Sequence, residues 1–364
     1  MEPEGDGVRK STEVTSSLKI GDVTIAGRVL MAPMTGVTDL PFRQLASRLG
    51  AAYVATEMVA AAELARARPD VVRRAAVGEG LPLTVIQLVG RDPEAMAQGC
   101  RMAEAAGADI IDLNFGCPAK EVTGSASGSA LMRTPRLACE LMAAAVAATT
   151  RPVTVKMRLG WDDGSRNAAD LARRAQDLGI AAVTVHGRTR QQFYTGRADW
   201  DAVGRVKDAV SIPVIVNGDI LTAEDARVAL SQSGADALML GRGVYGRPWL
   251  AGHLDRALAD GTRLAEPDRA ERLAIVLAHM QASIAFYDPP IGLKMFRKHL
   301  GWYIEQAPWP ADAGDRRAAK ARLCRMDTVA EVAVALAELW GQAVPYLGNS
   351  SVEFSPQVGE ATAA

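Results

Sequence analysis

Short apolar runs alternate with longer Ala-rich, charged segments from about residue 17 to residue 255. The apolar runs have the length of buried strands, and the segments between them have the spacing of amphipathic helices. We expect eight strands, at Val29–Ala32, Tyr53–Ala55, Thr84–Leu88, Ile110–Leu113, Val153–Met157, Ala182–Val185, Val214–Val216 and Ala237–Leu240. Helices are predicted between them, among others at Pro93–Ala106, Pro135–Ala148, Asn167–Leu178 and Ala223–Ser231.

The junctions between these elements follow a common pattern. Glycines in the left-handed cap conformation are expected to end four of the helical segments, at Gly50, Gly107, Gly179 and Gly234. Eight strand–helix units with almost continuous apolar strands predict a (β/α)8 TIM barrel of the α/β class. The alternative is a doubly wound open sheet, but the first strand–helix turn, residues 32–36, lacks the glycine fingerprint of that fold.

Both ends of the chain differ from this central pattern. Leu18–Ile25 predicts a hairpin that turns at Gly21-Asp22 and closes the barrel floor. No strand-like run follows residue 256, and helices are expected at Arg269–Phe286, Gly292–Gln306, Asp315–Met326 and Thr328–Trp340. We therefore predict a disordered tail over 1–16, a TIM-barrel catalytic domain over 17–255, a small all-helical domain over 256–346 and a disordered tail over 347–364.

Composition indicates in which cellular compartment the protein is expected to function. The 364 residues are 49% hydrophobic, yet no apolar run is long enough for a membrane span, and the first residues lack an apolar signal region. The four cysteines are scattered without a CxxC pair, so we expect no disulfide framework and no metal site. A reduced, cytoplasmic setting is the expectation.

Polar side chains follow nearly every predicted strand at its carboxyl end, where TIM barrels bind their ligands. In chain order they include Thr35, Glu57, Gln87, Asn114, Cys117, Lys156, Arg158, His186, Arg188, Asn217, Asp219 and Arg242. At the last two ends, Gly218, Gly241 and Gly243 would let backbone amides approach a phosphate, and Arg242 adds charge. Two ordinary turns would look similar, but two such loops at these strands favour a phosphate site.

Two strand residues indicate a ligand ring beside that phosphate. Lys156 lies in an apolar strand, where it either extends out to solvent or faces an anionic ligand. A reduced flavin is anionic near its pyrimidine edge, so a fixed lysine would stabilise it, and Gln87 could hydrogen-bond the same ring. His186 ends a strand beside an arginine, in a chain with only four histidines, which favours ligand contact over a structural role.

Cys117 lies just past a predicted strand, in the sequence Asn114-Phe115-Gly116-Cys117-Pro118. Three roles are open for this thiol: an inert packing group, a nucleophile or a general acid. Its loop position argues against packing, and a nucleophile would need a base to form the thiolate. A general acid needs only the proton that an unperturbed thiol keeps near neutral pH.

The helical region carries a local positive charge. Residues 290–325 include eight basic and three acidic side chains, whereas the whole chain has a net charge of −1. Lys294, Arg297 and Lys298 have the spacing of one helix face, and Trp302 and Tyr303 follow. This pattern indicates either a solvated helix face or a footprint for a phosphate backbone.

Several longer motifs occur together, in order, from about Leu18 to Tyr303. They are APMTGVTDLPFR, QLVG, NFGCPAKEV, GSALM, VKMRLGW, HGRTR, NGDI, GRGVYGRPW and LKMFRKHLGWY. Together they resemble the tRNA-dihydrouridine synthases, most of all the DusB type. The resemblance implies an FMN enzyme that reduces selected uridines of tRNA to 5,6-dihydrouridine with NADPH, or NADH, as reductant.

The resemblance also implies residue roles. Hydride would pass from the flavin to uracil carbon 6, and Cys117 would protonate carbon 5. FMN would be bound by Pro33, Met34, Thr35, Gln87, Lys156, His186, Asn217, Gly218, Asp219, Gly241 and Arg242. Contacts to the substrate are expected from Asn114, Arg158, Arg188 and Tyr194, and contacts to the RNA from Lys294, Arg297 and Lys298. The expected partners are tRNA and NADPH, with no membrane partner, and the expected state is a monomer.

Two other functions are compatible with parts of this pattern. A flavin barrel acting on a small molecule, such as a dihydroorotate-type dehydrogenase, would share the phosphate loops but would not need a basic helical surface. An RNA-binding module that has lost catalysis would share the helical surface but would not need Cys117.

Overall fold

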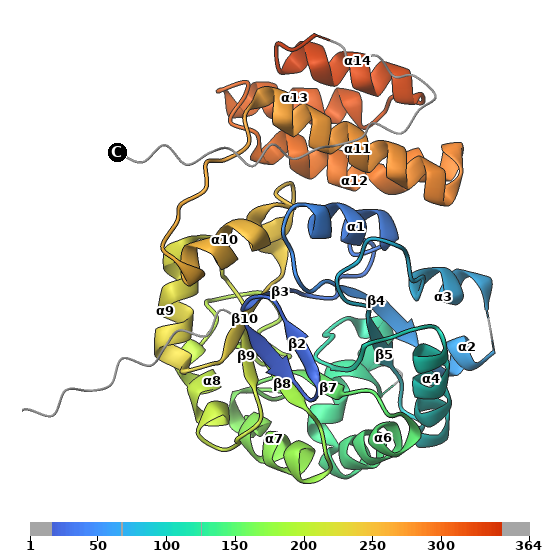
Figure 1. Cartoon of the computed structure of the whole chain (residues 1–364), viewed down its shortest axis with the longest axis vertical. Helices are drawn as coiled ribbons and strands as arrows, with labels where there is room; N and C mark the ends of the chain where they lie inside the picture. Colours follow the sequence, from blue (N-terminus) through green and yellow to red (C-terminus); the bar gives the residue numbers. More distant parts are fainter. Residues whose placement is uncertain (1–16, 67, 125, 344–364) are drawn as a thin grey trace, which may run out of the picture.

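Eight parallel strands form a closed barrel in the computed structural model, which describes residues 17–343 apart from 67 and 125 (Figure 1). The strands are β3 (Val29–Met31), β4 (Ala55–Ala60), β5 (Val85–Val89), β6 (Ile110–Phe115), β7 (Val153–Arg158), β8 (Ala182–His186), β9 (Val214–Asn217) and β10 (Ala237–Leu240). β3 pairs with β10, and the parallel bridge Met31↔Val54 joins β3 to the approach of β4. This closure confirms the TIM barrel and excludes the open sheet. Both predicted tails lie outside the described residues.

Helices surround the barrel on its outside (Figure 1). They are α1 (Leu40–Arg48), α2 (Ala61–Ala65), α3 (Pro69–Arg74), α4 (Pro93–Ala105), α6 (Pro135–Ala148), α7 (Ala168–Asp177), α8 (Trp200–Lys207), α9 (Ala223–Ser233) and α10 (Leu250–Ala259). The short helix α5 (Lys120–Thr123) and a 3-10 helix (Gly128–Arg133) follow β6. The four predicted cap glycines all have positive φ, from 59° at Gly234 to 95° at Gly50, which confirms their role.

Alternate side chains of the strands point to opposite sides of the barrel wall. On β6, Ile111, Leu113 and Phe115 pack in the core shared with the outer helices, whereas Ile110 belongs to the core at the floor. Asp112 and Asn114, which have the same parity as Ile110, therefore face the barrel interior. The interior is thus apolar at the floor and polar toward the carboxyl ends of the strands.

The N-terminal hairpin covers the floor of the barrel. It consists of β1 (Leu18–Ile20) and β2 (Val23–Ile25), and lies across one end of the barrel in Figure 1. Its apolar residues share a buried core with the first residues of several strands, among them Ile110, Ala182 and Ala237. Gly21 turns the hairpin with a φ of 60°. The predicted hairpin, its turn and its position are therefore confirmed.

The second barrel strand differs from its prediction. A strand was expected at Tyr53–Ala55, but β4 begins at Ala55 and continues to Ala60. The apolar run ends at Ala55, yet the strand continues through Thr56 and Glu57 because these polar residues find hydrogen-bond partners inside the protein. The hydroxyl oxygen of Thr56 accepts the backbone N–H of Gln87 at 3.0 Å, and Glu57 accepts the backbone N–H of Gly36. Hydropathy alone therefore placed this strand too early.

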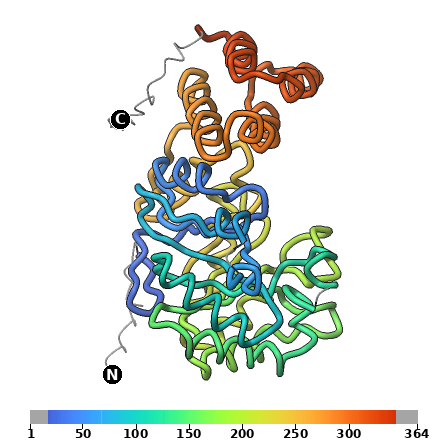
Figure 2. The backbone as a smooth tube through the Cα atoms, turned by 90° about the vertical axis from the view of Figure 1, so that its right-hand side faces the viewer, coloured from blue at the N-terminus to red at the C-terminus, as the bar shows by residue number. Residues whose placement is uncertain are grey.

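A bundle of four helices follows the barrel: α11 (Arg269–Tyr287), α12 (Pro289–Gln306), α13 (Ala313–Leu323) and α14 (Val329–Leu339). Figures 1 and 2 show it on one side of the barrel, next to α1 and α10. Its core includes Phe296, Leu300 and Leu336, together with Leu45 of α1 and Trp249. α12 begins earlier than predicted because prolines are tolerated in a first helical turn. Within the described residues, no helix combines the length and apolar character needed to span a bilayer.

Candidate active site

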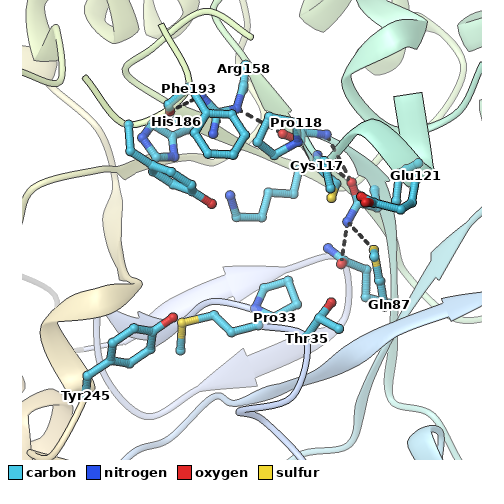
Figure 3. Close-up of a pocket in the computed structure, with 18 residues that line it drawn as sticks. Pro33, Thr35, Gln87, Cys117, Pro118, Glu121, Arg158, His186, Phe193 and Tyr245 are labelled. Carbon is cyan, nitrogen blue, oxygen red and sulfur yellow. Dashed lines mark hydrogen bonds between the residues drawn. The ribbon is translucent and has the colours of Figure 1, made fainter. Parts of the chain in front are cut away.

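Two adjoining pockets open at the carboxyl ends of the barrel strands, with volumes of about 490 and 400 Å³. We call them the thiol pocket, lined by Gln87, Cys117 and Phe193 among others, and the glycine pocket, lined by Gly218 and Gly241 among others. Six residues line both, namely Pro33, Met34, Lys156, His186, Tyr194 and Tyr245. The two pockets therefore form one cleft. Figure 3 shows Cys117 and Tyr245 on opposite sides of its thiol half.

The structure brings most of the predicted site residues into this cleft. All eleven residues predicted to bind the cofactor line one of the two pockets or both. Of the predicted substrate contacts, Asn114, Arg158 and Tyr194 line the thiol pocket, but Arg188 lines neither. The predicted RNA contacts lie on α12, outside both pockets.

The turn after β6 holds Cys117 at the cleft. The side-chain oxygen of Asn114 accepts the backbone N–H groups of Gly116 at 3.1 Å and of Cys117 at 2.9 Å. The Cys117 carbonyl accepts the hydroxyl of Ser129 at 2.9 Å. Burial raises the pKa of the thiol, and the Ala119 N–H and the nearby cations offset this only in part. Cys117 is therefore a neutral thiol at pH 7, which suits a proton donor better than a nucleophile.

Lys156 faces the cleft rather than the solvent. Its Nζ donates to the side-chain oxygen of Asn217 at 3.0 Å, and the Asn217 amide donates to the Met239 carbonyl at 2.7 Å. Burial and the positive charge of Arg158 lower the Lys156 pKa to about 8. The side chain therefore stays mostly protonated at pH 7 and presents a fixed cation to a ligand.

His186 contributes a neutral ring to both pockets. Burial and four surrounding cations hold its pKa well below the usual value. The ring packs against Gly218, where a Cβ atom would lie 3.1 Å from the imidazole Nε2. Gly218 also has a φ of 119°, which side chains rarely permit. The backbone just after β9 can therefore approach the His186 ring this closely only with glycine at this position.

The glycine pocket has the features of a phosphate site. A Cβ atom added to Gly241 would meet no protein atom within 4 Å, so this position faces open space. Arg242 is about half exposed at the same turn, with its guanidinium 4.6 Å from the Tyr194 ring centre. Arg242 also forms an ion pair with Asp219 at 3.7 Å, and a backbone turn beside a half-exposed guanidinium of this kind fits an anionic group.

Arg188 supports the glycine pocket from behind. Its guanidinium donates to both carboxylate oxygens of Asp219, at 2.9 and 2.6 Å, and to the carbonyls of Thr195 and Gly196. Burial opposes ionisation of Asp219, but the hydrogen bonds from Arg188 and Ala198 keep its pKa below the usual value. With its donors engaged and its side chain 2% exposed, Arg188 is not placed to contact a substrate, which corrects the role expected from the sequence.

Arg158 connects the two loops that border the thiol pocket. It is buried, and its guanidinium donates to the carbonyls of Gly116 at 2.9 Å, Thr189 at 2.9 Å and Phe193 at 2.8 Å. Phe193 has a φ of 53°, unusual for a residue with a side chain, and is 45% exposed. One buried cation therefore fixes an exposed aromatic ring relative to the cysteine turn.

The three predicted RNA contacts of α12 have different surroundings. Lys294 is exposed. Arg297 donates to the Met326 carbonyl and to Asp327, in the connection between α13 and α14. Lys298 reaches the loop after β3, where a Cβ on Gly36 would lie 2.6 Å from its Nζ. The three residues lie on one helix at the expected spacing, but their surroundings differ, and of the three only Lys294 is exposed.

α12 also contacts the cleft from outside through two loops. Lys298 lies against the loop after β3, near the carboxylates of Asp39 and Glu57. Trp302 stacks on Tyr245 of the loop after β10, with ring centres 3.9 Å apart and planes 12° apart. Both loops line the cleft, so the helical bundle braces two of its walls.

Sequence reasoning missed several residues of the site. Met58, Glu121, Phe193 and Tyr245 line the thiol pocket, and the buried residues Asp112 and Thr154 lie on the strands beneath it. A signal for the last two was present. Polar residues recur at every second position of β6 and β7, as Asp112, Asn114, Thr154, Lys156 and Arg158. A strand with one polar face inside a barrel is typical of a functional interior.

Solved structures share this architecture at low sequence identity. A complex of 2-naphthoyl-CoA reductase with 2-naphthoyl-CoA has a TM-score of 0.54 and 11% identity, over 68% of this chain and 52% of that one. The 6-hydroxypseudooxynicotine amine oxidase of Pseudomonas geniculata has a TM-score of 0.51 and 15% identity, over 74% and 52%. The chain thus matches about half the length of each, and the likeness shows a shared fold alone.

Sequence relatives are much closer. Proteins described as probable tRNA-dihydrouridine synthases are 47% identical in Rickettsia conorii, over 81% of this chain and 89% of the relative, and 50% identical in Rhizobium leguminosarum, over 81% and 90%. The tRNA-dihydrouridine synthase B of Pseudomonas putida is 44% identical over 80% and 87%. The model of the dihydrouridine synthase family matches residues 30–336. The chain therefore belongs to the dihydrouridine synthase family.

Proposed function

We propose that this protein is an FMN-dependent tRNA-dihydrouridine synthase that reduces selected uridines of tRNA with NADPH as reductant. The observation that carries the proposal is the pairing of a neutral thiol, Cys117, with a fixed cation, Lys156, in one cleft whose other end is lined by glycines and Arg242. The names of the relatives support the RNA substrate.

The cleft fits FMN in its dimensions and in the order of its groups. Gly218, Gly241 and Arg242 would hold the phosphate in the glycine pocket. Lys156 and the side-chain amide of Gln87 would face the ring system, since both line the thiol pocket and each has N–H hydrogens beyond the one donated to Asn217 or Asp112. Bound FMN would supply hydride to uracil carbon 6 after taking it from NADPH.

Cys117 would complete the addition across the uracil double bond. Hydride at carbon 6 leaves carbon 5 to be protonated, and the thiol would donate that proton from Sγ. The raised pKa of Cys117 keeps the proton in place until carbon 5 becomes basic. Arg158 holds the Gly116 carbonyl at 2.9 Å and so fixes the turn that carries the thiol.

The target uridine must leave its stack to enter the cleft. Phe193 and Tyr194 are 45% and 42% exposed at the thiol pocket, where aromatic rings can receive an unstacked base. The helices α11–α14 would hold the body of the tRNA mainly through its backbone and shape, with Lys294 as one exposed cation.

The decisive experiment measures dihydrouridine directly. Flavin-loaded protein is incubated with NADPH and with tRNA from cells lacking this gene, and the nucleosides are quantified by mass spectrometry. We expect dihydrouridine at defined positions, and parallel reactions with NADH rank the two reductants. A wild-type protein that binds flavin but forms no dihydrouridine in any of these RNAs contradicts the proposal. Turnover of orotate or dihydroorotate instead would favour a small-molecule flavin enzyme.

The matched control is Cys117→Ala. Its flavin content and its flavin reduction by NADPH should match the wild type, because the thiol does not take part in either. Dihydrouridine formation should fall by about 100-fold or more, the usual range for losing a general acid. Full turnover by this variant would remove Cys117 from the acid role.

A further inference from the structure

A buried carboxylate lies beneath the cleft and has no role in the chemistry described so far. Asp112 on β6 is 2% exposed and pairs in register with Gln87 on β5 and Thr154 on β7. Its two oxygens accept hydrogen bonds from these neighbours: Oδ1 from the Thr154 hydroxyl and Oδ2 from Gln87 Nε2, both at 2.7 Å. A buried carboxylate with two donors is a strong and oriented acceptor.

The same chain of side chains continues upward to the cysteine turn. The side-chain oxygen of Gln87 accepts from Asn114 Nδ2 at 2.8 Å. The side-chain oxygen of Asn114 in turn accepts the backbone N–H groups of Gly116 and Cys117. Asp112, Gln87, Asn114 and the Cys117 backbone thus form one hydrogen-bonded series, which we call the amide relay.

The polarity of the amide relay is fixed from both ends. The backbone N–H groups of Gly116 and Cys117 can only donate, so the oxygen of Asn114 must face them and its NH₂ must face Gln87. The oxygen of Gln87 must then face Asn114, and its NH₂ must face Asp112. A carboxylate can only accept hydrogen bonds. Asp112 therefore favours the orientation in which the Gln87 NH₂ faces it and disfavours the orientation in which the Gln87 oxygen would face it.

We propose that Asp112 is a positioning residue for Cys117, acting through the orientations of the Gln87 and Asn114 amides. The inference rests on the proposed function in so far as Cys117 is the proton donor. Without an acceptor at position 112, the Gln87 amide keeps only its hydrogen bond from Asn114, so both amides are held less firmly in their orientations. The turn carrying the thiol would become loose, although no residue of the turn has changed.

The relay has a second consequence inside the cleft. One hydrogen of Gln87 Nε2 is committed to Asp112 and the other is free, so Gln87 presents a donor to the cleft. Asn114 still orients Gln87 when Asp112 is removed, so this donor should keep facing the cleft and the cofactor side of the cleft should be little affected.

The test compares Asp112→Val, which removes the acceptor, with Asp112→Asn, whose oxygen can still face Gln87 while its NH₂ faces Thr154. Thr184→Val is the matched control, because it removes another buried polar group of a barrel strand outside the relay. If Asp112→Val does not fold, Asp112→Ser replaces it, since a serine hydroxyl is too short to reach Gln87.

The first readout needs neither cofactor nor turnover. Backbone hydrogen exchange in flavin-free protein should be faster by about tenfold in the segment 115–118 of Asp112→Val, because the Gly116 and Cys117 N–H groups lose a fixed acceptor. Asp112→Asn and Thr184→Val should match the wild type in this segment. Equal exchange in Asp112→Val and Thr184→Val overturns the inference.

The second readout separates the two half-reactions. Reduction of the flavin by NADPH should change by less than about threefold in Asp112→Val, whereas single-turnover reduction of uridine should fall by about 10- to 100-fold, as expected for a displaced reacting group. Asp112→Asn should restore uridine reduction to within about threefold. A parallel fall in both half-reactions overturns the inference, because it indicates a damaged cofactor site. If the wild type forms no dihydrouridine, the proposed function fails, but hydrogen exchange still tests the relay.

Discussion

The charge on Lys156 is predicted to make FMN affinity depend on pH in a range where few other side chains titrate. The Lys156 pKa is about 8, so its ammonium group is about nine-tenths formed at pH 7 and one-tenth formed at pH 9. If the bound form requires the cation, the dissociation constant of FMN rises about tenfold over this interval, or about 1.4 kcal/mol. FMN should therefore bind most tightly below the pKa of Lys156 and more weakly as pH rises through that pKa.

Quenching of FMN fluorescence at pH 7, 8 and 9 measures this directly. Lys156→Met should bind weakly at all three values, and Lys156→Arg should bind with little pH dependence because a guanidinium stays charged. Titration of the flavin itself is common to all three proteins and cancels in the comparison. An identical pH slope for wild type and Lys156→Met would refute the reasoning.

The stability of the flavin-free protein should show the opposite trend. The folded-state pKa of Lys156 lies below its ordinary value of 10.5, so the unfolded chain binds more protons between about pH 8 and 10.5. This residue therefore makes the folded state more stable as pH rises through that window. As pH rises, FMN affinity should fall while the contribution of Lys156 to folding stability increases. This combination is expected for a buried lysine that faces its ligand.

Three further predictions concern side chains whose roles the structure revises or adds. Arg188→Met should lower the free energy of unfolding, measured in urea, by about 2–4 kcal/mol, because Asp219 loses its buried partner. Arg166→Met removes a more exposed ion pair with Asp199 and should lower the free energy of unfolding by about 1 kcal/mol or less. Phe193→Ala should raise the KM for tRNA about tenfold at unchanged flavin content, while Phe193→Tyr keeps the ring and the affinity. Lys294→Ala should weaken tRNA binding in filter assays without changing flavin content, whereas Lys298→Ala should lower flavin retention through the loop after β3.

Each of these predictions has a contrary outcome. Equal losses of stability in Arg188→Met and Arg166→Met would mean that burial of the Arg188–Asp219 pair does not make it more stabilising than the exposed Arg166–Asp199 pair. A Phe193→Ala enzyme with normal KM would assign the exposed ring to folding rather than to RNA. Normal flavin content in Lys298→Ala, combined with weaker tRNA binding, would return this lysine to the RNA-binding role expected from the sequence.

The barrel could be predicted because most of its strands correspond to short apolar runs in the sequence. Val214–Asn217 is apolar until its final residue and Ala237–Leu240 is apolar throughout, so hydropathy finds both strands within one position. β4 was displaced because its buried polar residues, Thr56 and Glu57, interrupt the run. Their partners lie on other elements, and a sequence does not show which polar residues find partners.

Many residues that line the cleft could be predicted, but the hydrogen bonds between them could not. Strand ends place Gln87, Asn114 and Lys156 at the mouth, and motif resemblance assigns them to ligands. Which of their atoms remain free depends on partners brought from other strands. The direction of Lys298 depends on how α12 docks against the barrel, a long-range contact with no counterpart in the local sequence.

The contacts of α12 with the loops after β3 and β10 affect how such enzymes can be re-engineered. A chain cut near residue 255 would lose Lys298 and Trp302. It would therefore lose the two contacts by which α12 supports the loops that line the cleft. Such a fragment would probe cofactor retention before it probed RNA docking. Exchanging the helical bundle for that of a relative would therefore also change the walls of the cleft, unless Lys298, Trp302 and the loops they contact were transferred together.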